Sequence, residues 1–316
     1  MTILVTGTTG FVGGAIITEL LLQKRTAKAV VRTHKHNFKQ ATYVDAINAK
    51  TDFSQALEGC TTVIHSAARV HVMHDTSASP LEDFREVNTR GTVNLAKQAA
   101  AAGIKRFIFI SSIKVNGEAT VIGQPFTTQD PRSPEDDYGQ SKSEAELQLL
   151  EIAATTAMEV VIIRPCLIYG PGVKANFAAL MNLVSKGLPL PFGCITDNRR
   201  SMVSLTNLVD LIIRCIDHPK AANQVFLASD DHDLSTAELV SRMAKALGKP
   251  IRLLPIPLFL YRLAGKILAK QAVIDRLLGS LQVDITHTKT TLDWQPPQTV
   301  EDGFKQTADA FLQDKS

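Results

Sequence analysis

Short apolar runs alternate with longer segments of helical periodicity through the first half of the chain. The short runs, which predict buried strands, are residues 3–6, 28–32, 62–65, 106–111 and 160–163. The longer segments, which predict helices, are residues 12–22, 89–101 and 141–154. This alternation is typical of βαβ units, so we expect an α/β fold: a Rossmann-type doubly wound parallel sheet. In such a sheet, ligands bind at the carboxyl ends of the strands.

The pattern becomes irregular after Arg164-Pro165, where glycine and proline residues interrupt it repeatedly. Residues 236–247 still predict a helix, and residues 224–228 predict a short strand. We therefore expect a boundary near residue 170. Residues 1–170 would form the sheet domain, with a segment near 203–228 returning to it. Residues 171–316 would form mainly a smaller, mixed α/β carboxyl-terminal lobe.

Charge and cysteine content exclude some classes of protein. The 316 residues include 34 Lys and Arg against 31 Asp and Glu, a net charge of +3. We expect no nucleic-acid partner, because binding to nucleic acid depends on many cations that displace counterions. The four cysteines form no CxxC pair, which predicts buried, reduced thiols rather than disulfides or a zinc site: Cys60, Cys166, Cys194 and Cys215.

The expected location is the cytoplasm. Met1 leads directly into the first strand, with no basic region or cleavage site before it. The most apolar late stretch, residues 253–268, is interrupted by prolines and by Arg262 and Lys266. It is too short and too charged to span a bilayer, so we expect no membrane insertion.

A glycine-rich loop lies between the first strand and the first helix. Gly7, Gly10 and Gly13 recur at a spacing of three, and Phe11 and Val12 open the helix. Glycines let the backbone turn tightly and approach a pyrophosphate, and the helix N-terminus supplies free N–H groups with a partial positive charge. The loop therefore predicts a dinucleotide-binding site.

Two positions bear on which dinucleotide binds. The end of the second strand often carries an acidic residue that bonds the ribose hydroxyls of NAD, but here Arg32 stands there, followed by the basic residues His34, Lys35 and His36. A cationic cluster suits a 2′-phosphate and favours NADP over NAD, although a solvated basic loop is the alternative. Asp52 is a candidate for the adenine edge, and a surface role for it is nearly as well supported.

A candidate reactive group follows the strand at residues 106–111. Ser111-Ser112 ends that strand, and Tyr138 and Lys142 are spaced i, i+4, which places them on one face of a helix. A lysine ammonium beside a phenol favours the phenolate, so we expect a lowered Tyr138 pKa. Tyr138 could then remove a proton from an alcohol while a hydride leaves the carbon, and Ser112 could hold the same oxygen.

Several motifs together resemble one family, the extended short-chain dehydrogenase/reductases of the nucleotide-sugar epimerase/dehydratase group. The motifs are GTTGFVG at 7–13, HSAA at 65–68, VNTRGT at 87–92, FISS at 109–112, YGQSK at 138–142 and RPCLIYGPG at 164–172. The later segments DNRRSMVSLTNLVD and TLDWQPP also fit, so the resemblance covers essentially the whole chain.

The resemblance implies roles for individual residues. Ser112, Tyr138 and Lys142 match the family's catalytic triad, and Lys142 would also bond the nicotinamide ribose. Asn88 matches an asparagine behind the active site. Gly7, Gly10 and Gly13 match the family's cofactor loop. The full set of residues expected at the cofactor site is Gly7, Gly10, Phe11, Val12, Gly13, Arg32, Asp52, Ala67, Ala68, Tyr138 and Lys142.

The resemblance also implies that the carboxyl-terminal lobe binds a nucleotide sugar. Asn176 resembles a residue that contacts the sugar diphosphate, and Arg200 an arginine that clamps it, a role for which its forked guanidinium is suited. Arg276 is a candidate second clamp. A homodimer through helices that flank the active-site strand is a further implication of the family.

Three departures from the family pattern matter. Val115-Asn116-Gly117 stands where the family often has VYG, and Arg32 replaces the acidic residue that selects NAD. Ile113-Lys114 stands where dehydratases carry an Asp-Glu pair, so dehydratase activity is not expected. His65, His71 and His74 are candidate metal ligands, but without a nearby cysteine they fit core and loop histidines better.

The leading expectation is an enzyme that moves a hydride at C4 of a nucleotide sugar, a UDP-hexose or UDP-N-acetylhexosamine derivative. Arg32 and the missing dehydratase carboxylates favour a 4-keto-sugar reductase of surface-polysaccharide synthesis. The alternative is a UDP-glucose or UDP-N-acetylglucosamine 4-epimerase. A reductase of a non-sugar carbonyl, of the flavonoid-reductase kind, and a non-catalytic dinucleotide sensor are the remaining alternatives. The intact Ser112, Tyr138 and Lys142 set argues against the sensor.

Overall fold

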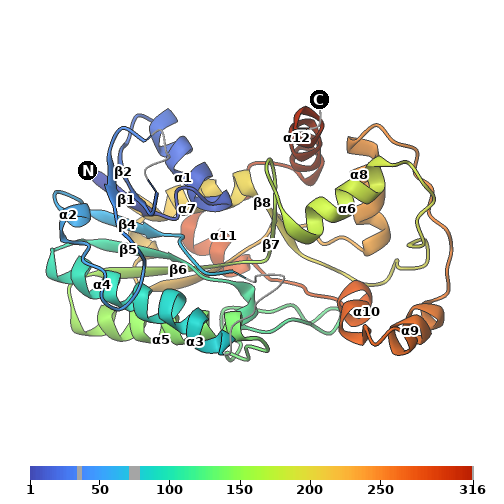
Figure 1. Ribbon diagram of the computed structural model, residues 1–316, viewed down its shortest axis with the longest axis horizontal. Helices are drawn as coiled ribbons and strands as arrows, with labels where there is room; N and C mark the ends of the chain where they lie inside the picture. Colours follow the sequence, from blue (N-terminus) through green and yellow to red (C-terminus); the bar gives the residue numbers. More distant parts are fainter. Residues whose placement is uncertain (34–37, 71–78, 315–316) are drawn as a thin grey trace.

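The protein folds around a parallel sheet of seven strands, as the sequence predicts. The computed structural model describes residues 1–33, 38–70 and 79–314. The strand order is β3-β2-β1-β4-β5-β6-β9, and every pairing is parallel (Figure 1). This is the doubly wound Rossmann arrangement. The strands are β1 (Thr2–Thr6), β2 (Thr26–Val31), β3 (Ala41–Tyr43), β4 (Thr62–His65), β5 (Arg106–Ile110), β6 (Glu159–Pro165) and β9 (Gln224–Ala228).

Helices cover both faces of the sheet, which explains why its central strands contain runs of consecutive apolar residues. One buried cluster joins the sheet to α1 (Phe11–Leu22), α7 (Leu205–Asp217) and α11 (Thr286–Leu292). A second cluster joins the other face to α2 (Ser54–Leu57), α4 (Thr92–Ala101) and α5 (Asp137–Thr155). Figure 1 shows α1 and α7 above the sheet, and α4 and α5 below it together with the short α3 (Pro80–Phe84).

The register of the strands brings their carboxyl ends to one edge. Thr6 lies opposite His65, and His65 lies opposite Phe109. The residues that follow these strand ends therefore share one rim of the sheet, which is where ligands bind in open α/β folds.

Two helical segments begin earlier in the chain than the apolar spacing predicts. The helix expected at residues 141–154 is α5, which begins at Asp137 because the Asp136 carboxylate accepts a hydrogen bond from the Gly139 N–H at 2.7 Å. The helix expected at 89–101 is preceded by a π-helical segment, Arg85–Gly91, which continues into α4. A widened segment of this kind is often found at a functional site.

The carboxyl-terminal part has its own apolar cluster, centred on Tyr169, Phe177 and Phe304. Tyr169 is in the two-stranded sheet of β7 (Leu167–Tyr169) and β8 (Met202–Ser204), whereas α7, β9 and α11 return to the large sheet. The division at residue 170 stays a prediction. The remaining helices are α6 (Ala175–Ser185), α8 (Thr236–Ala246), α9 (Leu258–Ile267), α10 (Gln271–Leu278) and α12 (Val300–Gln313), with 3-10 turns at Ile113–Val115 and Pro219–Ala221.

In the described part of the chain, no helix is both long enough and apolar enough to cross a membrane.

Candidate active site

A cavity of about 1330 Å³ opens at the carboxyl ends of the strands. It exceeds the roughly 300–1,000 Å³ typical of a site for one small ligand, so a dinucleotide and a second ligand could share it. Eleven of the residues predicted from the sequence line it: Gly7, Gly10, Phe11, Val12, Gly13, Arg32, Ala67, Ala68, Ser112, Tyr138 and Lys142.

The glycine loop is packed too closely for side chains. Gly7 has a φ of +73°, and a Cβ there would lie 2.7 Å from the Ala67 nitrogen. A Cβ on Gly13 would lie 2.2 Å from the Gly7 carbonyl oxygen and 2.6 Å from Ser66 Oγ. The loop is closed by a 2.8 Å hydrogen bond from the Gly10 N–H to the Gly7 carbonyl. Glycine is therefore required for β1, β4 and α1 to meet here.

The amino end of α1 fits the diphosphate of a dinucleotide. Its N-cap is Gly10, which offers no side-chain cap, and its first turn carries no acidic residue. The first backbone N–H groups and the positive end of the helix dipole thus face the cavity without competition from the chain's own carboxylates. Thr8 Oγ1, in the same loop, is buried with no hydrogen-bond partner among the described residues.

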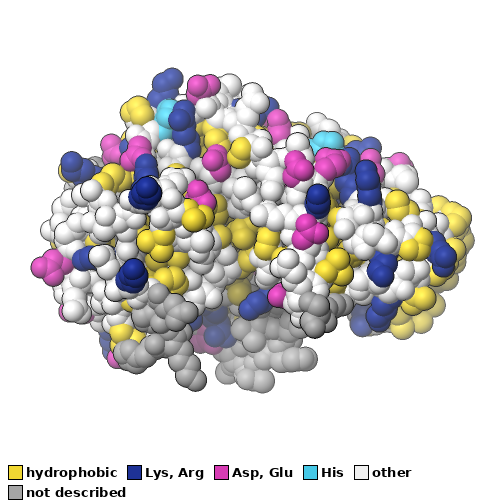
Figure 2. Space-filling model, turned by 90° about the horizontal axis from the view of Figure 1, so that it is seen from above, with side chains coloured by type: hydrophobic (Ala, Val, Ile, Leu, Met, Phe, Trp, Pro, Cys, Tyr) yellow, Lys and Arg dark blue, Asp and Glu magenta, His cyan; other side chains and the backbone are white. Residues whose placement is uncertain are grey.

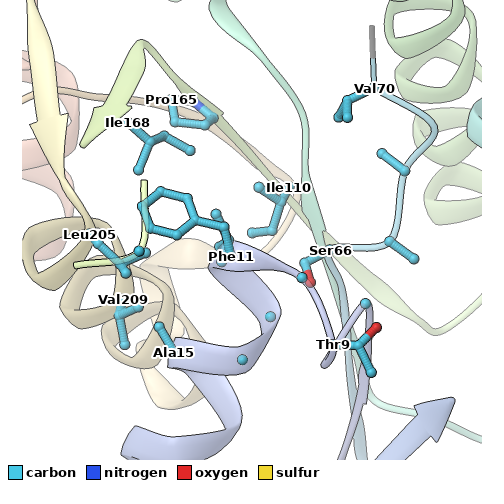
Figure 3. A pocket seen from close by; sticks show the side chains of 18 of the residues that line it. Thr9, Phe11, Ala15, Ser66, Val70, Ile110, Pro165, Ile168, Leu205 and Val209 are labelled. Atoms are coloured by element: carbon cyan, nitrogen blue, oxygen red, sulfur yellow. The ribbon is translucent and has the colours of Figure 1, made fainter. Parts of the chain in front are cut away.

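The floor of the cavity beside α1 is apolar. Figure 3 shows the Phe11 ring pointing toward Ile168 and Leu205, on the opposite side of its backbone from Ser66. Pro165 and Ile110 lie above it. Apolar side chains therefore line the space between the glycine loop and the carboxyl-terminal part of the chain.

The residues at the far end of the cofactor site differ from the prediction in one respect. Arg32, exposed at the end of β2, lines the cavity, and the neighbouring His34, Lys35 and His36 lie outside the described residues. Asp52 does not line it, because its carboxylate faces solvent and accepts the Ser54 N–H at 2.9 Å in a local turn. Ile47 lines the cavity instead. No sequence motif singles out Ile47, since an apolar residue in a loop has the same appearance as a core residue.

Ser112 and Tyr138 approach the cavity from different elements. Ser112 follows β5 and caps a 3-10 turn, accepting the Lys114 N–H at Oγ over 3.2 Å. Tyr138 is in the first turn of α5, and its ring meets Phe84 edge-on at 6.2 Å between centroids. Both line the same cavity as the glycine loop. The arrangement places a hydroxyl and a phenol where a ligand beside the cofactor site could meet both.

Lys142 is buried beneath this pair. Its Nζ donates a 2.8 Å hydrogen bond to the Ile110 carbonyl and lies 4.3 Å from the centroid of the Phe109 ring. Burial lowers the pKa of Lys142 to about 7, and the nearby Glu146 carboxylate opposes part of that fall.

The sequence predicts a lowered Tyr138 pKa, and this prediction is wrong when only the protein's own residues surround Tyr138. Burial raises the pKa of Tyr138 above its ordinary value, and the negative charge of Asp136 raises it further. The physical reason is that burial acts on both partners: a Lys142 whose pKa is near 7 is only partly charged at neutral pH. A further positive charge in the cavity is needed to stabilise the phenolate.

Asn88 lies behind the site, as the resemblance implies. It is fully buried on the π-helical segment, where its Oδ1 accepts the Arg69 N–H at 2.8 Å. Its Nδ2 donates to the Arg69 carbonyl and to Ser141 Oγ, both at 3.0 Å. One side chain therefore ties the loop after β4 to the residue next to Lys142.

A buried ion pair supports the strand end that carries the reactive serine. Arg164 donates to Glu146 from two nitrogens and to Asn116 Oδ1 at 2.9 Å. Ser111 Oγ donates to Glu146 at 2.5 Å. No motif in the sequence identifies this pair. The available signal is Glu146 four residues after Lys142, one helical turn further along α5.

Of the four residues predicted to contact the substrate, Ser112 lines the cavity and the three in the carboxyl-terminal lobe do not. Asn176 is exposed, although its neighbours Lys174 and Ala175 line the cavity. Arg200 donates to the carbonyls of Arg276 and Gly279 at 2.7 and 3.2 Å, so it caps the end of α10. Arg276 is exposed and pairs with Glu118 at 3.1 Å. Their contact with a substrate diphosphate stays a prediction.

His65 is a core residue. Its two ring nitrogens meet Thr6 Oγ1 at 2.7 Å and Thr92 Oγ1 at 2.9 Å, and burial lowers its pKa to about 3. His71 and His74 lie outside the described residues. Within residues 1–33, 38–70 and 79–314, no three His, Cys, Asp or Glu side chains form a group that could hold a metal ion.

Several known proteins are similar to this chain in sequence. The chain matches the NAD dependent epimerase/dehydratase family over residues 3–228. A UDP-glucose 4-epimerase from Vibrio cholerae is 62% identical over 314 residues, covering 98% of this chain and 95% of that protein. An N-acetyl-alpha-D-glucosaminyl-diphospho-ditrans,octacis-undecaprenol 4-epimerase from Escherichia coli is 28% identical, covering 96% of this chain and 93% of that one.

Solved structures share the fold. A UDP-glucose 4-epimerase from Thermotoga maritima, solved with UDP-glucose, superposes with a TM-score of 0.78 at 20% identity over the full length of both chains. A UDP-glucuronic acid 4-epimerase from Bacillus cereus, solved with NAD, gives 0.77 at 19% identity, also over both full lengths. The resemblance found in the sequence is confirmed: this chain belongs to the NAD dependent epimerase/dehydratase family and is an enzyme of the extended short-chain dehydrogenase/reductase type.

Proposed function

We propose that the protein is a 4-epimerase of UDP-hexoses, interconverting UDP-glucose and UDP-galactose or their N-acetyl forms. The observation that carries the proposal is that Ser112, Tyr138 and Lys142 line the same cavity as the glycine loop. The 62% identity to a UDP-glucose 4-epimerase supports both the reaction and the UDP-sugar substrate.

The residues divide the chemistry between them. Tyr138 takes the proton of the C4 hydroxyl and returns it after the sugar has turned. Ser112 Oγ holds the same oxygen. Lys142 lies beneath the site and holds its floor in place by donating to the Ile110 carbonyl. The loop from Gly7 to Gly13 and the first turn of α1 would hold an oxidised nicotinamide dinucleotide. When bound, that cofactor supplies a hydride acceptor and a positive charge.

The comparisons support the epimerase over the 4-keto-sugar reductase that the sequence favours. The two arguments for the reductase were Arg32 and the absence of dehydratase carboxylates. An epimerase does not need those carboxylates either, since it expels no hydroxyl group, so their absence fits both enzymes. An epimerase returns its hydride to the same sugar, so it gains nothing from a pool of reduced NADP.

We propose NAD as the cofactor of this cycle. The family description names NAD, and retention of one cofactor molecule suits a reaction with no net redox change. Arg32 would in addition give NADP a contact for its 2′-phosphate. A preference for NADP, which Arg32 favours by itself, is the competing outcome.

The test is conversion without added cofactor. Purified protein is incubated with UDP-glucose, and UDP-galactose is measured by anion-exchange chromatography, with the same assay on the N-acetyl forms. We expect both directions to approach equilibrium, and NAD to be released when the protein is denatured. Turnover only with a 4-keto sugar and stoichiometric NADPH would establish the reductase instead.

A second candidate substrate is a sugar diphosphate carried on a polyprenol. The Escherichia coli relative is named as a 4-epimerase of a substrate of this kind. The reacting C4 centre is the same, and only the group beyond the diphosphate differs. The exposed apolar side chains on α9 and α10 are the observation in this chain that favours it. Parallel assays with UDP-N-acetylglucosamine and polyprenyl-diphosphate N-acetylglucosamine compare the two substrates directly.

We make three further proposals, on the two parts of the chain, the oligomeric state and the location. We propose that residues 1–170 with 203–228 bind the dinucleotide and that residues 171–316 mainly bind the nucleotide sugar. We also propose a homodimer through helices that flank β5, and a cytoplasmic location. Sedimentation velocity of the purified protein tests the dimer.

A further inference from the structure

Two helices of the carboxyl-terminal part expose an apolar surface. On α9 the side chains of Phe259, Leu263 and Ile267 recur every four residues and are 65%, 50% and 73% exposed. Leu268 and Val273, at and after the turn into α10, are also largely exposed. We call these five residues the α9–α10 face. Side chains of this size are normally buried, so a continuous group of them indicates a surface that meets something else.

The two helices form a hairpin whose own contacts leave this face uncovered. A Cβ on Gly265 would lie 2.8 Å from Ile274 Cγ1, so α9 and α10 pack closely at that point. Gly265 is the buried residue of α9, and α10 has none. The hairpin buries the side that holds Gly265 and Ile274, and it presents the stripe at Phe259, Leu263 and Ile267 to solvent.

The charge around the face is mainly positive, although α10 also carries the exposed Asp275 beside the exposed Arg276. Between residues 249 and 274 the chain has no Asp or Glu, whereas five cations are present, all exposed: Lys249, Arg252, Arg262, Lys266 and Lys270. Figure 1 places α9 and α10 at one end of the molecule, and at the same end Figure 2 shows hydrophobic and basic side chains next to one another. The whole chain carries only +3, so this concentration of positive charge is local.

We propose that the α9–α10 face binds to the surface of an anionic lipid membrane. Amphipathic helices that lie in a membrane interface combine an apolar stripe of Leu, Ile and Phe with Lys and Arg beside it. The apolar stripe enters the boundary between headgroups and acyl chains, and the cations meet lipid phosphates. The hairpin adsorbs to one leaflet, which agrees with the absence of a membrane-spanning helix in the described chain.

Charge complementarity favours this occupant over a second copy of the chain. Two copies of the face placed together would bring Arg262, Lys266 and Lys270 close to the same cations of the partner. Asp275 on α10 is a carboxylate next to the face, and one such group in each copy does not balance the three cations of the partner. An anionic bilayer supplies many negative charges and an apolar layer at the same place, so it satisfies both properties of the face.

Vesicle co-sedimentation tests the proposal with the intact protein. Large vesicles of phosphatidylglycerol mixed with phosphatidylcholine are compared with vesicles of phosphatidylcholine alone. We expect roughly tenfold more protein to sediment with the anionic vesicles, and most of this binding to be lost at about 1 M salt, where charge attraction is screened. Equal sedimentation with both vesicles, or none with either, would overturn the proposal.

Two double variants separate the apolar and ionic contributions. Leu263→Gln with Ile267→Gln removes part of the stripe, and Arg262→Glu with Lys266→Glu reverses part of the charge. Each should lower vesicle binding at least roughly tenfold. Leu22→Gln is the matched control, because Leu22 is 71% exposed at the end of α1, far along the chain from this face, and should bind vesicles as the parent does.

The activity assay keeps this proposal separate from the proposed epimerase. Conversion of soluble UDP-glucose by the two double variants should equal that of the parent, because none of the four residues lines the cavity. Vesicle binding without epimerase activity would sustain the membrane proposal and reject the enzymatic one. A parent protein that is dimeric, but becomes monomeric in the Leu263→Gln, Ile267→Gln variant, would assign the face to a second copy and overturn the proposal.

Discussion

The carboxylate of Glu146 and the guanidinium of Arg164 form an ion pair with side chains only 0% and 3% exposed. The pair lies between α5 and β6, and Ser111 Oγ donates to the same carboxylate. Glu146 is also one helical turn from Lys142, whose pKa its charge raises against the effect of burial. One buried carboxylate therefore supports both the strand end beside Ser112 and the protonation of the lysine beneath Tyr138.

Removal of that carboxylate should destabilise the fold. Glu146→Gln leaves the Arg164 cation buried without its charge partner, and loss of one member of a buried pair costs roughly 3–5 kcal/mol. Urea unfolding measures the free energy. Glu151→Gln, an exposed change on the same helix, is the control and should cost less than about 0.5 kcal/mol. A loss for Glu146→Gln as small as the control's would show that the pair contributes nothing.

Tyr138→Phe tests the proton transfer. The variant keeps the ring contact with Phe84 but loses the hydroxyl, so we expect turnover to fall by roughly 10²–10⁴ while NAD binding is kept. Steady-state rates and NAD content after denaturation measure the two effects. Tyr43→Phe, on the exposed β3, is the control. Normal turnover in Tyr138→Phe would exclude the phenol as the acid and base.

Arg32→Asp tests which end of the cofactor Arg32 meets. A lost charged hydrogen bond to a 2′-phosphate costs roughly 1.5–3 kcal/mol, so NADP affinity should fall at least tenfold while NAD affinity is kept. Isothermal titration with both dinucleotides measures this. Lys50→Asp, at an exposed position outside the cavity lining, should leave both affinities unchanged. Equal affinities before and after the Arg32 change would mean that this cation faces only solvent.

Arg200→Ala separates a substrate contact from a structural one. If Arg200 clamps the diphosphate, UDP binding should weaken by roughly 1.5–3 kcal/mol while stability changes little. Titration with UDP and thermal unfolding measure the two quantities. Because Arg200 already donates to the carbonyls of Arg276 and Gly279, loss of stability with unchanged UDP affinity would assign it to capping α10 alone.

His65 should make the fold sensitive to acid. Its pKa is lowered to about 3 by burial and by the positive charge of Lys142, so the folded state stays neutral while the unfolded chain binds a proton below pH 6.5. Its contribution to stability is therefore lost as pH falls from 6.5 toward 3, by up to about 1.4 kcal/mol for each pH unit. Urea unfolding at pH 7, 6 and 5 should show a shallower fall for His65→Gln. The exposed His232→Gln should keep the parent's slope.

Local spacing was sufficient for much of the fold and of the cofactor site. Strands and helices of the sheet followed from apolar periodicity, because burial on both faces of a parallel sheet imposes that pattern on each segment separately. The loop from Gly7 to Gly13 and the Tyr138–Lys142 pair are also predictable from the sequence. Each of them depends only on residues within seven positions of one another. The start of α5 was misplaced because the Asp136 cap, rather than apolar spacing, determines it.

What only the tertiary structure decided depends on residues far apart in the chain. The raised pKa of Tyr138 and the lowered pKa of Lys142 come from burial, which no i, i+4 spacing specifies. The partner of Glu146 is 18 residues away on β6, and the carbonyls that Arg200 meets are on a helix more than 70 residues later. The exposure of the apolar stripe on α9 is a further example, because periodicity indicates that a helix face is apolar but packing alone determines whether anything covers it.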